Sequence, residues 1–319
     1  MIDELMSNIN TITRNSLIPK KYFISKSGFM LKNFEDKLIF IGGFSTNNNN
    51  KLSQKLSQYE VLERYYTHYG DHSNKKFKLI NFFSSKQVGE LKLEDSLIGP
   101  LPNGKMSKKD SNGVAFHLDA RKADRNAILE IIERHILYEL WYGNLKFIKI
   151  RKDKKLQVDV VQSWYTCFLP NLIPFVVTIL KIDGVLIFGS SVKSSYKEAI
   201  EKSSGEAYMI LDGILRKDKG MSNSNRSKRK LLSLQDVKLA KKRGKYIEDK
   251  TIDKKIQINI KQVYSVGEII NNLEWDEYNV KIARLYESKK GTVSRAIIGN
   301  AKSVLSVDSS DKKIPDPFS

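Results

Sequence analysis

Segments with a strand pattern alternate along this chain with long segments that have a helix pattern, and this alternation constrains the fold most. Short runs rich in Val, Ile and Phe predict strands at 37–44, 77–83, 113–117 and 279–287. Apolar residues at helical spacing predict helices at 51–69, 119–142 and 194–217. Because no clear linker separates them, we expect one α/β domain over 1–319, with mixed sheets packed against long helices.

The longest apolar stretch, "FLPNLIPFVVTILKIDGVLIFGS", is too interrupted to cross a membrane. Pro170, Pro174, Lys181 and Asp183 break it, and its Val, Ile and Phe content predicts two strands joined by a turn at "KIDG". The N-terminus "MIDELMSNIN" has acids where a signal peptide needs bases. A single cysteine, Cys167, excludes an internal disulfide framework. We therefore expect a soluble cytoplasmic protein with no membrane partner.

The chain is strongly basic, with 55 Lys and Arg against 36 acids and a formal charge of +19. Such an excess fits a polyanionic or acidic partner. Much of it, however, lies in residues 216–250, where Ser, Asn and Gly indicate a mobile surface excursion whose bases are solvated. We favour that interpretation and do not expect nucleic acid as the partner, although a nucleic-acid-binding protein stays open as an alternative.

A Glu-x-x-Glu-Arg pattern occurs twice, each time on a predicted helix. The copies are Glu60, Glu63 and Arg64, and then Glu130, Glu133 and Arg134. The spacing places the three side chains of each copy on one helical face. Two carboxylates one turn apart can ligate Mg²⁺ that is shared with phosphate oxygens. A single copy, however, is more typical of an exposed salt-bridge face.

The residues around both copies add a more specific signal. "SNGVAFHLDARKADRNAILEIIERHILYELWYGN" resembles the central motif of the YcaO family, and "KLSQKLSQYEVLERYY" resembles its first helix motif. "GSSVKSSYKEAIEKSSGEAYMI" resembles the third motif, a turn of small residues followed by a helix with Glu206. The tail "IPDPFS" is similar to the proline-rich C-terminus of many peptide-modifying members, although it departs from the usual spacing. The four motifs occur in the family's order from about residue 40 to 319.

This resemblance implies an ATP-dependent cyclodehydratase. A Cys, Ser or Thr side chain of a ribosomal precursor peptide attacks the preceding amide carbonyl, ATP phosphorylates the amide oxygen, and phosphate leaves to give a thiazoline or oxazoline. It also implies site residues: the metal ligands are Glu60, Glu63, Glu130 and Glu133, the nucleotide contacts Arg64, Arg134, Lys202 and Glu206, and the catalytic residues Glu60, Glu130 and Glu206.

The resemblance further implies a multiprotein synthetase. The expected cofactors are ATP and Mg²⁺. The expected partners are the precursor peptide, a leader-binding E1-like protein and a flavin-dependent dehydrogenase that oxidises azolines. Formation of a thioamide or amidine by the same ATP chemistry is the alternative among enzymes, and a non-catalytic scaffold is the alternative of another class.

Overall fold

The N-terminal part of the chain folds into a three-stranded antiparallel sheet covered by a helix. The elements are α1 (Ile2–Asn8), β1 (Asn10–Asn15), β2 (Phe23–Lys32), β3 (Leu38–Asn47) and α2 (Asn50–His68). This computed structural model describes residues 2–32, 38–68, 76–92, 112–157, 160–167, 171–182, 184–216, 234–253, 257–299 and 301–302. Helix α2 approaches β2 so closely that Ser27 Oγ lies 2.6 Å from Ser57 Oγ. Contacts between small polar side chains and the apolar contacts of Val61 and Leu62 thus both hold the helix against the sheet.

A larger sheet forms the second layer. Its strands are β7 (Phe147–Lys149), β8 (Lys154–Gln157), β9 (Val160–Cys167), β10 (Phe175–Ile182), β11 (Val185–Val192) and β12 (Thr251–Ile252), in the order β11-β10-β9-β7-β12 with β8 paired to β9. Strands β10 and β11 are antiparallel from Phe175↔Val192 to Ile182↔Val185, as the turn at "KIDG" predicts. Helix α5 (Tyr196–Leu215) covers one face, where Leu211 packs near Leu180. Helix α7 (Leu234–Lys250) covers the other.

A five-stranded antiparallel sheet completes the fold. Its strands, in the order β5-β4-β13-β14-β6, are β5 (Gln87–Lys92), β4 (Lys76–Asn81), β13 (Val280–Ser288), β14 (Gly291–Ile298) and β6 (Val114–His117). Two helices and one 3₁₀ turn accompany it: α4 (Ala120–Trp141), α8 (Val266–Asn272) and η2 (Glu277–Asn279).

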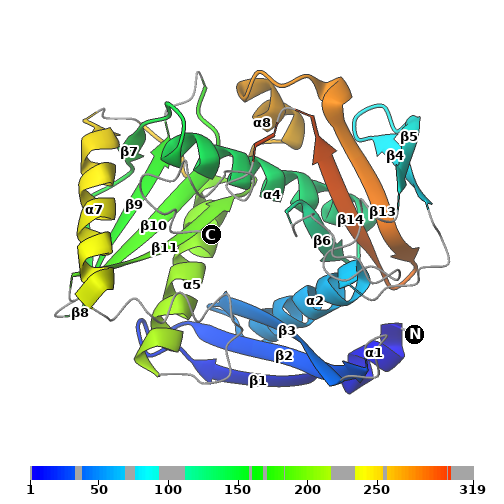
Figure 1. Cartoon of the computed structure of the whole chain (residues 1–319), viewed down its shortest axis with the longest axis horizontal. Helices are drawn as coiled ribbons and strands as arrows, with labels where there is room; N and C mark the ends of the chain where they lie inside the picture. Colours follow the sequence, from blue (N-terminus) through cyan, green and yellow to red (C-terminus); the bar gives the residue numbers. More distant parts are fainter. Residues whose placement is uncertain are drawn as a thin grey trace.

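Helix α4 joins the two larger sheets and lies at the centre of the main apolar core. Its buried Ile128, Ile132 and Ile136 are fully inaccessible and belong to one cluster with residues of β10, β11, β13 and β14. Asp119 caps its N-terminus by accepting a hydrogen bond from the Lys122 amide. Figure 1 shows α2, α4 and α5 arranged around the middle of the molecule. The mixed α/β class predicted from the sequence is confirmed.

The basic segment 216–250 is only partly described. Residues 234–250 form α7, whose buried Ala240 and Ile247 pack on the large sheet. The prediction of a mobile excursion is therefore wrong for residues 234–250. Their few apolar residues lie on one face of a helix and are enough to pack it against the sheet. Residues 217–233 and the tail 314–319 lie outside the described residues. In the part of the chain that is described, no helix has both the length and the apolarity to cross a membrane.

Candidate functional site

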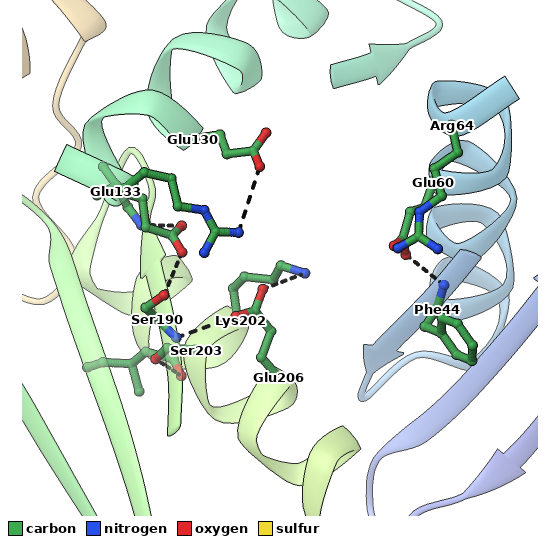
Figure 2. Close-up of polar contacts among 12 residues, drawn as sticks. Phe44, Glu60, Arg64, Glu130, Glu133, Ser190, Lys202, Ser203 and Glu206 are labelled. Atoms are coloured by element: carbon green, nitrogen blue, oxygen red, sulfur yellow. Dashed lines mark hydrogen bonds and ion pairs between the residues drawn. The ribbon is translucent and has the colours of Figure 1, made fainter. Parts of the chain in front are cut away.

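Acidic side chains from three helices face one central space (Figure 2). Helix α4 supplies Glu130 and Glu133, α5 supplies Glu206, and α2 supplies Glu60 on the opposite side. Glu63 of α2 belongs to the same group, because the charges of Glu130 and Glu60 both act on its carboxyl. The structure thus brings together the five carboxylates that the sequence predicted as a site.

On the α2 side, Glu60 is held in a fixed position. Its Oε2 accepts a hydrogen bond of 2.6 Å from the amide of Phe44 in β3. Its Oε1 forms an ion pair of 2.5 Å with Arg64, one turn along the helix. Arg64 also donates to the Gly42 carbonyl. Arg64 and Glu60 therefore each tie α2 to β3 and also hold one another in place.

On the α4 side, Glu133 is anchored to β11 while Glu130 is held more loosely. Ser190 Oγ donates to Glu133 Oε1 at 2.6 Å, and the Val192 amide donates to Oε2 at 3.3 Å. Glu130 receives a backbone hydrogen bond from Val114 of β6, and its Oε1 lies 3.9 Å from Arg134. Both carboxylates are half-buried. The loosely paired Glu130 keeps lone pairs available for another ligand.

The α5 side contributes Glu206 and Lys202. Glu206 Oε2 accepts from the Ser190 amide at 3.4 Å, and its Oε1 lies 3.2 Å from Lys202 Nζ. Because Ser190 contacts both Glu133 and Glu206, the two carboxylates meet at the same point of β11. Lys193, just beyond β11, is the other cation that acts on these acids.

Burial and the charges of neighbouring carboxylates raise the pKa values of three of these groups, Glu63, Glu130 and Glu133. Burial raises the pKa of Glu130 to about 7, with Glu133 adding to the effect against Arg134. Burial and then Glu130 and Glu60 raise the pKa of Glu63. Burial and then Glu206 raise the pKa of Glu133. The centre therefore favours the binding of additional positive charge.

The arrangement fits a shared cation better than a closed metal site. Within the described ranges, no three His, Cys, Asp or Glu side chains are placed to hold a metal ion by themselves. Mg²⁺ commonly takes one or two carboxylates and completes its shell with water and phosphate oxygens. Carboxylate oxygens that face one another across a space can supply these few protein ligands and leave room for phosphate oxygens.

A structural repeat relates Glu60 to Glu206, and our sequence reasoning missed it. The helix carbonyl of Ser57 approaches Gly43 of β3 so closely that a Cβ there would lie 2.2 Å from it. Gly189 of β11 faces the carbonyl of Ser203 in the same way, at 2.1 Å. In both units the strand amide after the glycine then donates to the glutamate: Phe44 to Glu60 and Ser190 to Glu206.

The sequence contains the signal for this repeat. Each unit has a strand glycine, a serine 14 positions later and a glutamate 17 positions later, in "IGGFST…SQYE" and "IFGSSV…SSGE". The helix serine of each unit also has an equivalent partner. Ser57 Oγ contacts Ser27 Oγ in the first unit, and Ser203 Oγ lies 2.8 Å from Thr178 Oγ1 in the second. The site thus contains two repeats: the Glu-x-x-Glu-Arg pattern on α2 and α4, and a strand-and-helix unit formed by β3–α2 and by β11–α5.

Comparisons with known proteins give structural matches alone. No family model matches the sequence, and no curated protein matches it either. A chain of the E. coli microcin synthetase McbBCD complex aligns with a TM-score of 0.66 at 13% identity, over 90% of this chain and 87% of that one. YcaO from Methanopyrus kandleri, bound with AMPPCP and Mg²⁺, aligns at 0.60 and 10%, over 92% and 85%. A heterocyclase in complex with substrate and cofactor aligns at 0.66 and 12%, over 93% of this chain and half of that longer one.

These matches define the fold. A mixed α/β protein with carboxylates from three helices around one space is similar in fold to enzymes of the heterocyclase and synthetase type. More specifically, the chain has the YcaO-like fold that its motifs predict.

Proposed function

We propose that this protein is an ATP-dependent cyclodehydratase that converts Cys, Ser or Thr residues of a ribosomal precursor peptide to thiazolines or oxazolines. One observation carries the proposal: on a YcaO-like fold, carboxylates from three helices face one space, where burial and then neighbouring carboxylates raise the pKa values of Glu63, Glu130 and Glu133. Such a centre is suited to Mg²⁺ and a polyphosphate, whose charges cancel each other there.

In this proposal Glu60, Glu63, Glu130 and Glu133 are the Mg²⁺ ligands. When bound, ATP with Mg²⁺ supplies the phosphoryl group that makes a backbone amide oxygen a leaving group. Helix α4 contributes Glu130, which is the more loosely held ligand. The hydrogen bond from Ser190 to Glu133 fixes the position of α4 relative to β11. The structure of the Methanopyrus protein, which is bound with AMPPCP and Mg²⁺, supports this assignment by its similar fold.

The cationic residues have different roles. Arg64 already pairs with Glu60 and the Gly42 carbonyl, so we assign it to positioning that ligand. Lys202 is exposed and, although burial opposes its charge, Glu206 and Glu60 raise its pKa. It therefore stays positive at neutral pH and can contact phosphate, together with Arg134.

The proposed chemistry needs no covalent nucleophile on the enzyme. Cys167, the one cysteine of the chain, is buried, and burial raises the pKa of its thiol to about 12. It is therefore not a reactive thiolate at neutral pH. Positioning and charge neutralisation are the main requirements for phosphoryl transfer, and the carboxylate centre can provide both.

We also propose that the protein works with partners in the cytoplasm: the precursor peptide, a leader-binding E1-like protein and a flavin-dependent dehydrogenase. The similar E. coli chain belongs to a synthetase complex that was also solved with pro-MccB17 bound, which supports a peptide substrate and a partner protein. The test is to mix the chain and a co-encoded partner with ATP, Mg²⁺ and a Cys- and Ser-rich precursor. We expect phosphate release that requires the peptide, together with loss of one water per ring. Exchange of oxygen for sulfur or nitrogen would instead identify a thioamide or amidine, and release without peptide would contradict the proposal.

The pH dependence of Mg²⁺ binding follows from the raised pKa values. Glu130 titrates near 7 in the folded chain and near 4.5 when unfolded. The stability that this group contributes is thus fully present below the unfolded pKa and is lost as pH rises through about 7. Mg²⁺ competes with the bound proton, so MgATP should raise the melting temperature more at about pH 8 than at about pH 5.5. An equal rise at both pH values, measured by thermal unfolding, would place the ion elsewhere.

A further inference from the structure

A cavity lies on the far side of α5 from the carboxylate centre. Its volume is about 350 Å³, close to the lower end of small-molecule sites. The segment before β2, strands β8 and β9, and helix α5 form its walls. On α5, Lys197, Ser204 and Tyr208 line it, and their spacing of 7 and 4 positions places them on one helical face. Glu206 lies on another face of the same helix, so the cavity is separate from the carboxylate centre.

The cavity has an excess of positive charge. Its cationic side chains are Lys21, Arg151, Lys154 and Lys197, and its one carboxylate is Glu201. Among the residues that the structure describes, none of these four cations has a carboxylate within ion-pair distance. Most exposed lysines need no partner, but four cations around one concave space repel each other unless an anion is present.

Arg151 is fixed in a position suited to anion binding. Its guanidinium carbon lies 3.7 Å from the centroid of the Trp164 ring, a stacking distance. Trp164 is buried and donates from Nε1 to Ser204 Oγ at 3.1 Å, so the surface beneath Arg151 is rigid. Stacking occupies one face of the guanidinium and leaves its N–H edges without a partner among the described residues. A fork of N–H groups held in this way matches the oxygens of a phosphate or carboxylate.

The floor of the cavity is polar but already satisfied. Tyr208 Oη donates to Gln162 Oε1 at 2.7 Å, and Gln162 Nε2 donates to Ser204 Oγ at 2.9 Å. The ring of Tyr22 contacts that of Tyr208 edge-on, with centroids 4.9 Å apart. These groups give the cavity a fixed shape without neutralising its charge. Aromatic and aliphatic walls complete it: Tyr22, Leu156, Ile200 and Ile260.

We infer that this cavity binds a small organic phosphate monoester, with its phosphate on Arg151 and its organic part against Tyr22 and Ile200. The charge decides between oxyanions. Four cations facing one carboxylate leave a surplus that a phosphate dianion neutralises better than a single carboxylate does. The walls favour an ester over inorganic phosphate, because part of the cavity is apolar. The inference does not depend on the proposed cyclodehydratase activity.

Calorimetric titration of the full chain with phenyl phosphate, in buffer without Mg²⁺, phosphate or sulfate, tests this inference. Omitting Mg²⁺ leaves the carboxylate centre negatively charged, so that it repels the probe. We expect saturable binding that is tighter than that of inorganic phosphate. Arg151→Gln should weaken it at least about tenfold, and Arg151→Lys should weaken it less, because the charge stays while the fork is lost.

Lys181→Gln is the matched control, because Lys181 is an exposed lysine of β10 that does not line the cavity. It should leave phenyl phosphate binding unchanged. Arg151 is exposed and outside the regular elements, so its variants should keep the wild-type melting temperature. Absence of binding at about 10 mM phenyl phosphate, well above the range of functional sites, would overturn the inference. Equal losses in the Arg151 and Lys181 variants would also overturn it, since they would show a general charge effect.

Discussion

Glu130→Gln is expected to lower peptide-dependent ATP hydrolysis on the order of a hundredfold or more, because it removes one charge from the proposed Mg²⁺ shell. The substitution keeps the size of the side chain and the backbone contact with Val114. It also removes a carboxyl whose pKa burial and Glu133 hold near 7, so the stability at about pH 8 should be unchanged or higher. Loss of activity without loss of stability is the signature of a functional carboxylate.

Glu139→Gln on the same helix is the control for this experiment. Its carboxylate pairs with Lys302 at 3.0 Å on the opposite side of α4 from the carboxylate centre. Surface pairs of this kind contribute at most about 1 kcal/mol, so its turnover should stay within about twofold of wild type. The measurements are phosphate release with peptide and the melting temperature of each variant. Wild-type turnover in Glu130→Gln would remove Glu130 from the site and return its triplet to an ordinary salt-bridge face.

The sequence predicted those parts of the fold in which apolar periodicity and end signals agree. Helix α4 has Asp119 at its N-cap and buried Ile residues at helical spacing, and it begins and ends within one residue of the predicted range. The β10–β11 hairpin follows from two runs of β-branched residues around "KIDG". In both cases local preference and burial favour the same structure.

Other parts could not be predicted from hydrophobic patterns. Strands β1 and β2 pair antiparallel, and the facing side chains are polar: Thr11 Oγ1 lies 2.8 Å from Ser27 Oγ and Thr13 Oγ1 lies 2.8 Å from Ser25 Oγ. Such residues give little apolar alternation, although Ser25 and Ser27 are fully buried. Helix α7 was not predicted either. Its many lysines indicate an exposed segment, although Ala240 is buried.

The resemblance and its triplets predicted which carboxylates would share one site, but they did not predict how closely the helices approach the strands. Spacing along one helix says which side chains share a face, but not which strand lies beneath them. That information lies in Gly43 and Gly189, which let Ser57 and Ser203 reach the sheet. A search for a strand glycine followed at a fixed distance by Ser-x-x-Glu would have linked Glu206 to Glu60 before the structure was known.

Gly189→Ala should have the largest effect on stability. An added Cβ would lie 2.1 Å from the Ser203 carbonyl oxygen and 2.8 Å from the Ala207 amide, and both atoms belong to the backbone of α5. Backbone cannot yield as a flexible side chain does, so the helix must move away from β11. We expect a loss on the order of 3 kcal/mol in the free energy of unfolding. Gly43→Ala should cost about as much, because its Cβ would lie 2.2 Å from the Ser57 carbonyl.

Gly89→Ala in β5 separates this close approach from the general effect of replacing a strand glycine. The nearest atom to a Cβ there is a Leu79 methyl at 4.0 Å, and the change should alter stability by less than about 1 kcal/mol. Urea unfolding followed by circular dichroism gives the three values, and the yield of soluble protein serves where a variant does not fold. Displacement of α5 would also move Glu206 away from the Ser190 amide, so Gly189→Ala should lose MgATP-dependent stabilisation as well. Equal stabilities for Gly189→Ala and Gly89→Ala would mean that α5 can move away from β11 at little cost. That result would contradict the claim that the close approach of α5 to β11 fixes the position of Glu206.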